Sequence, residues 1–245
     1  MTKHVNFKAR SLISKIRLSW TVLFDKIFNV NRILVIGDSH AEIFTKPFFN
    51  NFSRNSRLYV CAVGGATLSG LSNPNSQTQA SPIFKKAYNY VKPKNVIFLL
   101  GEVDTGFLLW LLHDKTGREI DDLLDKAISN YKNLIINMQG SSSTVIISTP
   151  LPTIKDNQTW GDIANARKNV NASQMERTNL TLLFNYKIKI WSLTQGLKYL
   201  DLDDISLGED GLVSPELLNS NPNDHHYCDQ AYASLVIQRL KSYLV

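Results

Sequence analysis

The sequence has 245 residues, of which 43% are hydrophobic and 20% charged. These values fit one medium-sized α/β domain with a full core, leave two small domains open, and argue against wholesale disorder. The formal net charge is +6, but the chain has no RNA-binding fingerprint, zinc-finger spacing or long basic run, so we expect no nucleic-acid partner. The two cysteines, Cys61 and Cys228, form no C-x-x-C motif, so neither a zinc ribbon nor a thioredoxin-like site is expected.

Residues 1–30 read as a basic amphipathic arm, ahead of a domain that spans 31–245. This segment contains one acidic residue, Asp25. Its basic residues are Lys3, Lys8, Arg10, Lys15, Arg17 and Lys26. Charges interrupt the apolar stretch 12–28, and no small-residue cleavage site follows, so it predicts neither a spanning helix nor a signal peptide. We therefore expect a cytoplasmic protein. The stretch predicts an amphipathic helix that either packs on the domain or rests on an anionic membrane surface.

Predicted strands and helices alternate along the rest of the chain. The strands are expected at 32–36, 58–62, 95–100, 144–148 and 198–202. The helices are expected from 41, at 83–91, at 121–138, from 171 to 184 or on to 191, and at 229–244. This alternation predicts an α/β fold with one central parallel sheet and helices on both faces. Ligands of such sheets bind beyond the carboxyl ends of the strands, where the polar clusters of this chain lie.

The first such cluster is Gly-Asp-Ser-His at residues 37–40. A serine at a tight turn between a strand and a helix can direct its hydroxyl into the crevice, near helix N–H groups that favour developing negative charge. Serine is a poor nucleophile unless a base lies within hydrogen-bond reach. Ser39 is therefore a candidate nucleophile, and the alternative is that it only caps the following helix.

The base is best sought in the loop before the last helix, at His225 and His226. The other histidines are less suitable: His4 in the basic arm, His40 beside the serine and His113 in an apolar segment. Adjacent side chains are expected to point in different directions, so one imidazole would face Ser39. Asp224 is close enough in sequence to orient it. Metal binding by the pair would need a third ligand, so neither a metal nor a cofactor is assigned.

Four motifs, in order, resemble those of the SGNH/GDSL hydrolase superfamily. Residues 37–40 match the first block, whose serine is the nucleophile, and residues 64–67 (Gly-Gly-Ala-Thr) resemble the second. Residues 101–104 (Gly-Glu-Val-Asp) occupy the place of the third block, Gly-x-Asn-Asp in the family. Residues 223–226 (Asn-Asp-His-His) occupy the place of the last block, Asp-x-x-His. The resemblance implies a flavodoxin-like, three-layer α/β/α sandwich. It also implies that Gly65 joins the oxyanion hole.

Two departures from the family pattern affect the site. Val103 replaces the asparagine that donates to the oxyanion, and the Ser39 and Gly65 amides would remain as donors. Its neighbours Glu102 and Asp104 are expected to organise the loop or to bind a sugar hydroxyl. The residue three before His226 is asparagine. Three arrangements therefore stay open: Asp224 orients His226 through a shifted loop, Asn223 does so as a neutral group, or the site is a serine–histidine dyad.

The resemblance implies a serine esterase without a cofactor. Ser39 would attack an ester carbonyl while His226 takes its proton. The variant motifs resemble SGNH-like proteins found near glycan-assembly enzymes, which implies an O-acetyl or similar ester of a carbohydrate. Three aromatic residues are candidates for stacking on a sugar or for core packing: Trp110, Trp160 and Tyr227. The alternatives are a glycan O-acyltransferase and a non-catalytic glycan-binding or assembly protein. The sequence does not indicate an oligomeric state.

Overall fold

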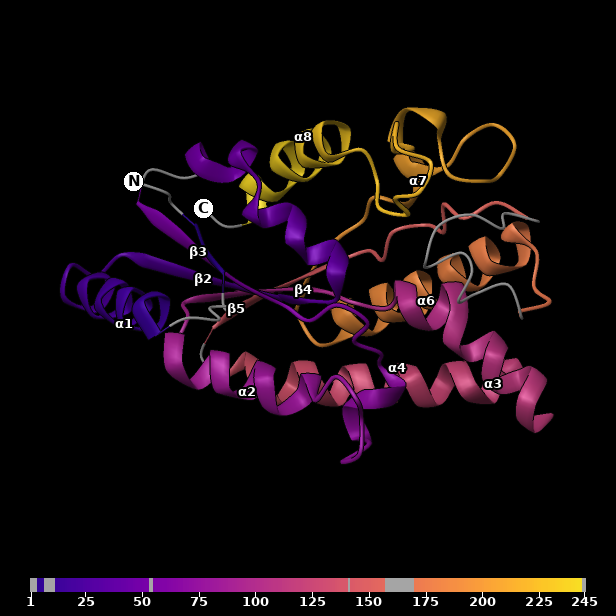
Figure 1. The fold of residues 1–245 in the computed structure, drawn as a ribbon, viewed down its shortest axis with the longest axis horizontal. Coiled ribbons are helices and arrows are strands. Elements are labelled where there is room, and N and C mark those ends of the chain that lie inside the picture. Colours follow the sequence, from indigo (N-terminus) through magenta and orange to yellow (C-terminus); the bar gives the residue numbers. More distant parts are fainter. Residues whose placement is uncertain (1–3, 7–11, 53–54, 141, 157–169, 244–245) are drawn as a thin grey trace.

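The computed structural model describes residues 4–6, 12–52, 55–140, 142–156 and 170–243. Their strands form one sheet in which all neighbours run parallel, in the order β1-β3-β2-β4-β5-β6 (Figure 1). The strands are β1 (His4–Asn6), β2 (Asn31–Gly37), β3 (Ser56–Ala62), β4 (Asn95–Leu99), β5 (Ser143–Ile147) and β6 (Lys198–Leu200). The predicted α/β class with a central parallel sheet is confirmed.

Helices cover both faces of the sheet and make three layers (Figure 1). One face packs against α1 (Leu12–Ile27), α2 (Ala80–Val91), α3 (Leu109–Thr116), α4 (Ile120–Gln139) and α6 (Gln174–Thr194). The other packs against two 3₁₀ segments and α8 (Asp229–Leu240), with the short α7 (Asp203–Ser206) nearby. Because both faces are covered, the central strands are apolar after their first one or two residues, which is why they were recognisable as continuous apolar runs.

Two expectations about local structure were wrong. The sheet begins earlier than predicted, because β1 pairs with β3 at the sheet edge, with His4 opposite Leu58. β1 has only three residues, one of them apolar, so its sequence has no recognisable strand pattern. The helix expected from residue 41 is instead two 3₁₀ segments, Ser39–Thr45 and Pro47–Asn51. Pro47 explains the break, since the residue before a proline is driven into extended backbone, as Lys46 is here (φ −73°, ψ 153°).

The carboxyl ends of β2, β3 and β4 meet at one edge of the sheet. Gly37 lies opposite Ala62 on one side and Leu99 on the other. A Cβ at Gly37 would lie 2.4 Å from the Leu99 carbonyl oxygen, so no larger residue fits there. The Val63 N–H donates to the Gly37 carbonyl at 2.9 Å and joins the loops that follow β2 and β3. The loops that carry Ser39 and Gly65 therefore leave the sheet side by side.

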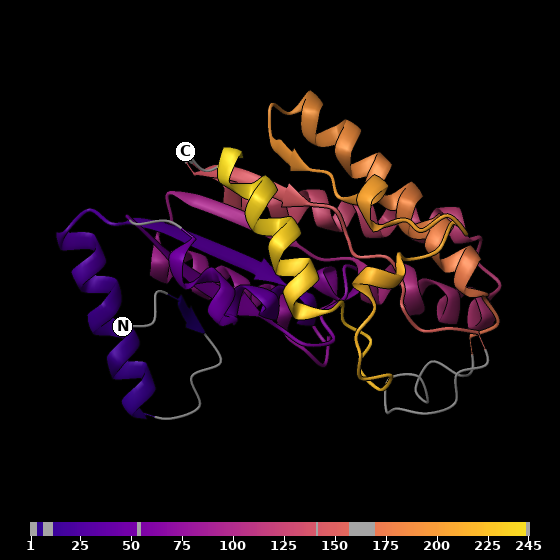
Figure 2. The ribbon, with the colours of Figure 1, turned by 90° about the horizontal axis from the view of Figure 1, so that it is seen from above.

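Helix α1 lies at one end of the molecule (Figure 2) and confirms the helix predicted for the N-terminal arm. It is held by Asp25, which is 1% exposed and accepts hydrogen bonds from Arg57 Nε at 2.7 Å and the Tyr59 hydroxyl at 2.6 Å. Its last two turns expose the apolar side chains of Trp20, Leu23, Phe24 and Ile27, and Phe28, just beyond its end, is exposed as well. Among the described helices, none has the length and apolar character needed to cross a membrane.

Candidate active site

Ser39 is the first residue of the 3₁₀ segment that follows β2. The cap of this segment is Asp38, whose carboxylate accepts a hydrogen bond from the His40 N–H at 2.9 Å. Ser39 is therefore not needed as the cap. It is half-buried and lines a cavity of about 440 Å³ together with His225 and His226. The structure thus brings the predicted nucleophile and the predicted base to one cavity. Among the described residues, no hydrogen bond joins the Ser39 hydroxyl to His226.

His226 is oriented by Asp224. One carboxylate oxygen of Asp224 accepts from the His226 backbone N–H at 3.0 Å and lies 2.7 Å from ring Nδ1. Burial acts to raise the pKa of Asp224, but these hydrogen bonds and the charges of His226 and His225 outweigh it, so the pKa lies below its usual value. The opposite ring nitrogen, Nε2, is buried and has no hydrogen-bond partner among the described residues. Of the three arrangements left open by the sequence, this contact matches the one with Asp224.

The loop that carries the histidines is fixed by the segment that follows β5. The Thr153 hydroxyl donates to the His225 carbonyl at 2.6 Å, and the Leu151 N–H donates to the Tyr227 hydroxyl at 2.7 Å. An ion pair of 2.6 Å between Lys46 and Asp229 also ties the turn after Ser39 to the start of α8. The loop that carries His226 is therefore held on both sides of this residue, at His225, Tyr227 and Asp229.

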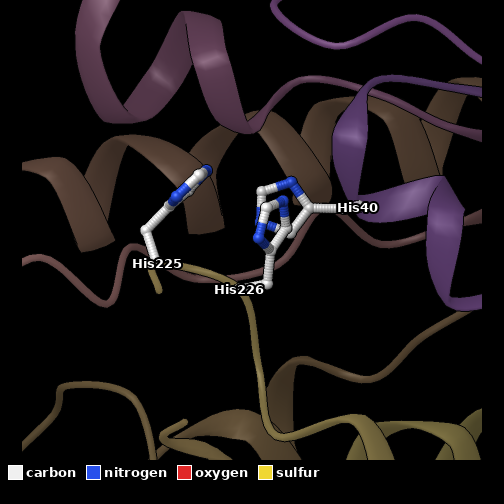
Figure 3. A group of neighbouring side chains, drawn as sticks. All are labelled: His40, His225 and His226. Carbon is white, nitrogen blue, oxygen red and sulfur yellow. The ribbon is translucent and has the colours of Figure 1, made fainter. Parts of the chain in front are cut away.

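A third histidine, His40, lies beside the pair (Figure 3). Its ring centre is 4.7 Å from that of His226 and 5.7 Å from that of His225. The rings of the adjacent His225 and His226 are themselves 4.1 Å apart, so the expectation that they point in different directions was wrong. His40 was not expected to act as the base because it adjoins Ser39 in sequence, although Asp-x-His occurs both at 38–40 and at 224–226.

Asp104 organises the loop after β3. It is completely buried and accepts hydrogen bonds from the Leu68 N–H at 2.6 Å, and from the Ser69 N–H and hydroxyl at 3.1 Å each. Burial raises the pKa of Asp104 to about 7, although these donors act to lower it. A carboxyl in this position cannot reach a sugar, so of the two roles expected for Asp104 the loop-organising one matches its contacts.

The remaining predicted residues lie near the same sheet edge. Gly65 is exposed and has a φ of +71°, a conformation that side chains rarely adopt. Glu102 is 2% exposed, and Val103 is half-buried and offers no polar side-chain atom. None of these three, nor Asp104, lines the cavity that contains Ser39.

The aromatic residues considered for sugar stacking have different positions. Tyr227 is 2% exposed and its hydroxyl is occupied by the Leu151 N–H, so core packing describes it better. Trp110 is half-buried, and its ring N–H donates to the Thr105 carbonyl at 2.9 Å. Trp160 lies outside the described residues. The two cysteines, Cys61 and Cys228, are free.

No family model and no curated protein sequence matches the chain. Several solved structures do match the chain. A GDSL-like lipase from Bacteroides thetaiotaomicron superimposes with a TM-score of 0.62 at 12% identity, covering 94% of this chain and 96% of that one. The chain has the fold of the SGNH/GDSL hydrolases. Similar values hold for an aryl esterase from M. smegmatis (TM-score 0.57, 12% identity, 87% and 100% covered) and a carbohydrate acetylesterase from Sinorhizobium meliloti (0.52, 11%, 86% and 97%). The fold that the motif resemblance implied is thereby confirmed.

Proposed function

We propose that this SGNH-fold protein is a serine esterase in which Ser39 is the nucleophile, His226 the general base and Asp224 the residue that orients it. The observation that carries the proposal is the Asp224–His226 pair. Within the described part of the chain His226 Nε2 has no hydrogen-bond partner, and His226 lines the same cavity as Ser39. A carboxylate can only accept hydrogen bonds, so the Nδ1 of His226 carries the proton and Nε2 keeps its lone pair. That is the tautomer a general base needs.

The reaction then proceeds in two halves. As the Ser39 oxygen attacks the ester carbonyl, its proton passes to His226 Nε2, and the amides of Ser39 and Gly65 stabilise the oxyanion. Collapse of the tetrahedral intermediate breaks the ester C–O bond, and the departing alcohol takes the proton from Nε2. Water attacks the acyl-serine in the same way and releases the acid. The sequence offers no side-chain donor at Val103, so we expect a slower enzyme than one with asparagine there.

We propose an ester of a carbohydrate, such as an O-acetyl group, as the substrate. The support is the likeness of the motifs to SGNH-like proteins near glycan-assembly enzymes, together with one structural neighbour that is a carbohydrate acetylesterase. If a sugar hydroxyl replaces water in the second half, the same residues would transfer the acyl group. A non-catalytic glycan-binding role is the second candidate, and Val103 is the observation that favours it.

We also propose that α1 contacts the anionic surface of a membrane, on the cytoplasmic side. Its exposed stripe contains Trp20 and Phe24 and continues into Phe28, just beyond the end of the helix. The three rings follow one another at separations of 6.4 and 6.2 Å. The one acidic residue of the arm, Asp25, is buried against Arg57 and does not offset the basic residues around it. An apolar stripe within a basic segment is the pattern of an interfacial helix. The free cysteines fit the reducing cytoplasm.

The esterase proposal is tested by labelling with a fluorophosphonate probe, which reacts with activated serines. The wild type is compared with Ser39→Ala and His226→Ala, and Ser234→Ala, at an exposed position of α8, serves as a serine control outside the cavity. We expect labelling of the wild type and the control, and none of the two site variants. A folded wild type that stays unlabelled would contradict the esterase proposal and favour the glycan-binding role. Release of acetate from acetylated oligosaccharides then tests the substrate.

A further inference from the structure

We propose that His40, His225 and His226 form a binding site for Zn²⁺ or a similar divalent transition-metal ion. One ring nitrogen from each of the three residues lies within 4.8 Å of the others (Figure 3). Zinc–nitrogen bonds of about 2.0–2.1 Å place tetrahedral ligand atoms about 3.4 Å apart. The three nitrogens would therefore move closer together when an ion binds. Three imidazoles that leave one position open form a well-known type of zinc ligand set.

Two of the three imidazoles are already oriented as metal ligands. Asp224 holds His226 by two contacts, and Asp38 holds His40 in the same way. The Asp38 carboxylate accepts a hydrogen bond from the His40 backbone N–H at 2.9 Å and lies 3.1 Å from ring Nδ1 of His40. Each carboxylate fixes the proton on Nδ1 and leaves Nε2 as the lone-pair atom. A carboxylate behind the ring is the usual support for a metal-binding histidine, because it sets the tautomer and the ring angle.

The environment of His226 Nε2 also points to a ligand. This atom is buried and has no hydrogen-bond partner among the described residues, and a buried polar atom of that kind costs free energy until something binds it. The serine is one such partner, and a metal ion is another. His40 is 5% exposed and follows the rigid turn after β2, while the Thr153 hydroxyl fixes the backbone at His225. The three ligands are therefore supported from independent parts of the fold.

The site extends beyond the esterase proposal and has a consequence for it. A metal ion on His226 Nε2 would occupy the lone pair that receives the serine proton. The metal-bound protein would then lack its general base, so metal binding and serine reactivity would exclude each other. The metal site itself does not depend on Ser39 being reactive.

The test uses the full chain, freed of metal by a chelator and titrated with Zn²⁺ by calorimetry and with Co²⁺ by visible absorption. We expect one ion per chain and the intense bands of four-coordinate cobalt. His225→Ala, at a half-buried position, should weaken binding at least tenfold, and Asp38→Asn by about ten- to a hundredfold. His113→Ala, a histidine outside the cluster, should not change it. Circular dichroism establishes that each variant is folded.

Absence of Zn²⁺ binding at millimolar concentration, or binding that His225→Ala leaves unchanged, would overturn the metal site. Fluorophosphonate labelling of the metal-free protein is measured in parallel, so that failure of the esterase proposal is seen separately. If both proposals hold, Zn²⁺ should suppress labelling and the chelator should restore it. If the metal binds but the metal-free serine stays unlabelled, the metal site holds and the esterase does not.

Discussion

Asp224 contacts His226 twice through one carboxylate oxygen, at 3.0 Å from the backbone nitrogen and 2.7 Å from ring Nδ1. The residues are two apart in sequence, whereas the family pattern places the acid three before the histidine. The shift by one residue is accommodated because the carboxylate turns back onto its own loop. The acid therefore orients the ring and caps the local turn with the same oxygen.

This geometry predicts the outcome of a pair of substitutions. Asp224→Asn should slow labelling by the fluorophosphonate probe by about 10² to 10⁴, because the amide no longer holds the productive tautomer of His226. Asn223→Ala should have little effect, since the Asn223 side chain is exposed. Labelling rates of the two variants decide the point. A large loss in Asn223→Ala with an unchanged rate in Asp224→Asn would assign the orienting role to the asparagine.

Val103 allows a gain-of-function test of the oxyanion hole. Val103→Asn restores the side-chain donor that the motif comparison finds missing. Loss of one such donor typically costs about 10² to 10³ in rate, so we expect hydrolysis of p-nitrophenyl acetate to rise at least tenfold. Val103→Ala is the control for the change in size and should not accelerate the reaction. An unchanged rate in Val103→Asn would mean that position 103 does not face the reacting carbonyl.

The sheet was predictable because its strands are buried on both faces and read as continuous apolar runs. β1 was missed because pairing of three residues with β3 is decided by the tertiary fold. That Ser39, Asp224 and His226 lie around one cavity was predictable, because parallel strands deliver their following loops to one edge of the sheet. The position of His40 beside His226 depends on how two distant loops pack, which no local pattern encodes.

Asp104 makes stability depend on pH. Burial raises its pKa to about 7, whereas the unfolded chain releases the proton near 4. Between these values the folded state holds a proton that the unfolded state has lost. The contribution of Asp104 is therefore complete below pH 4 and falls as the pH rises to 7. At about 1.4 kcal/mol per pKa unit, the fall amounts to roughly 4 kcal/mol.

Urea unfolding of the wild type and Asp104→Asn at pH 4.5, 6 and 8 tests this effect. Asparagine stays neutral, so the difference in unfolding free energy between the two proteins isolates Asp104 from other titrating groups. We expect the wild type to lose stability relative to the variant as the pH rises. A difference that stays constant over this range would mean that Asp104 is already ionised in the folded protein at pH 4.5.

The exposed stripe of α1 predicts binding to anionic vesicles. The wild type should co-sediment with phosphatidylserine vesicles more than with phosphatidylcholine vesicles, and salt should weaken binding because the basic arm contributes electrostatically. Replacing Phe24 and Phe28 together by glutamate should reduce binding at least tenfold, since both rings are more than half exposed and lose their insertion into the interface. The matched control replaces Ile136 and Ile190, exposed apolar residues on α4 and α6, by glutamate. Equal losses in both double variants would show that added negative charge, and not the α1 stripe, determines binding.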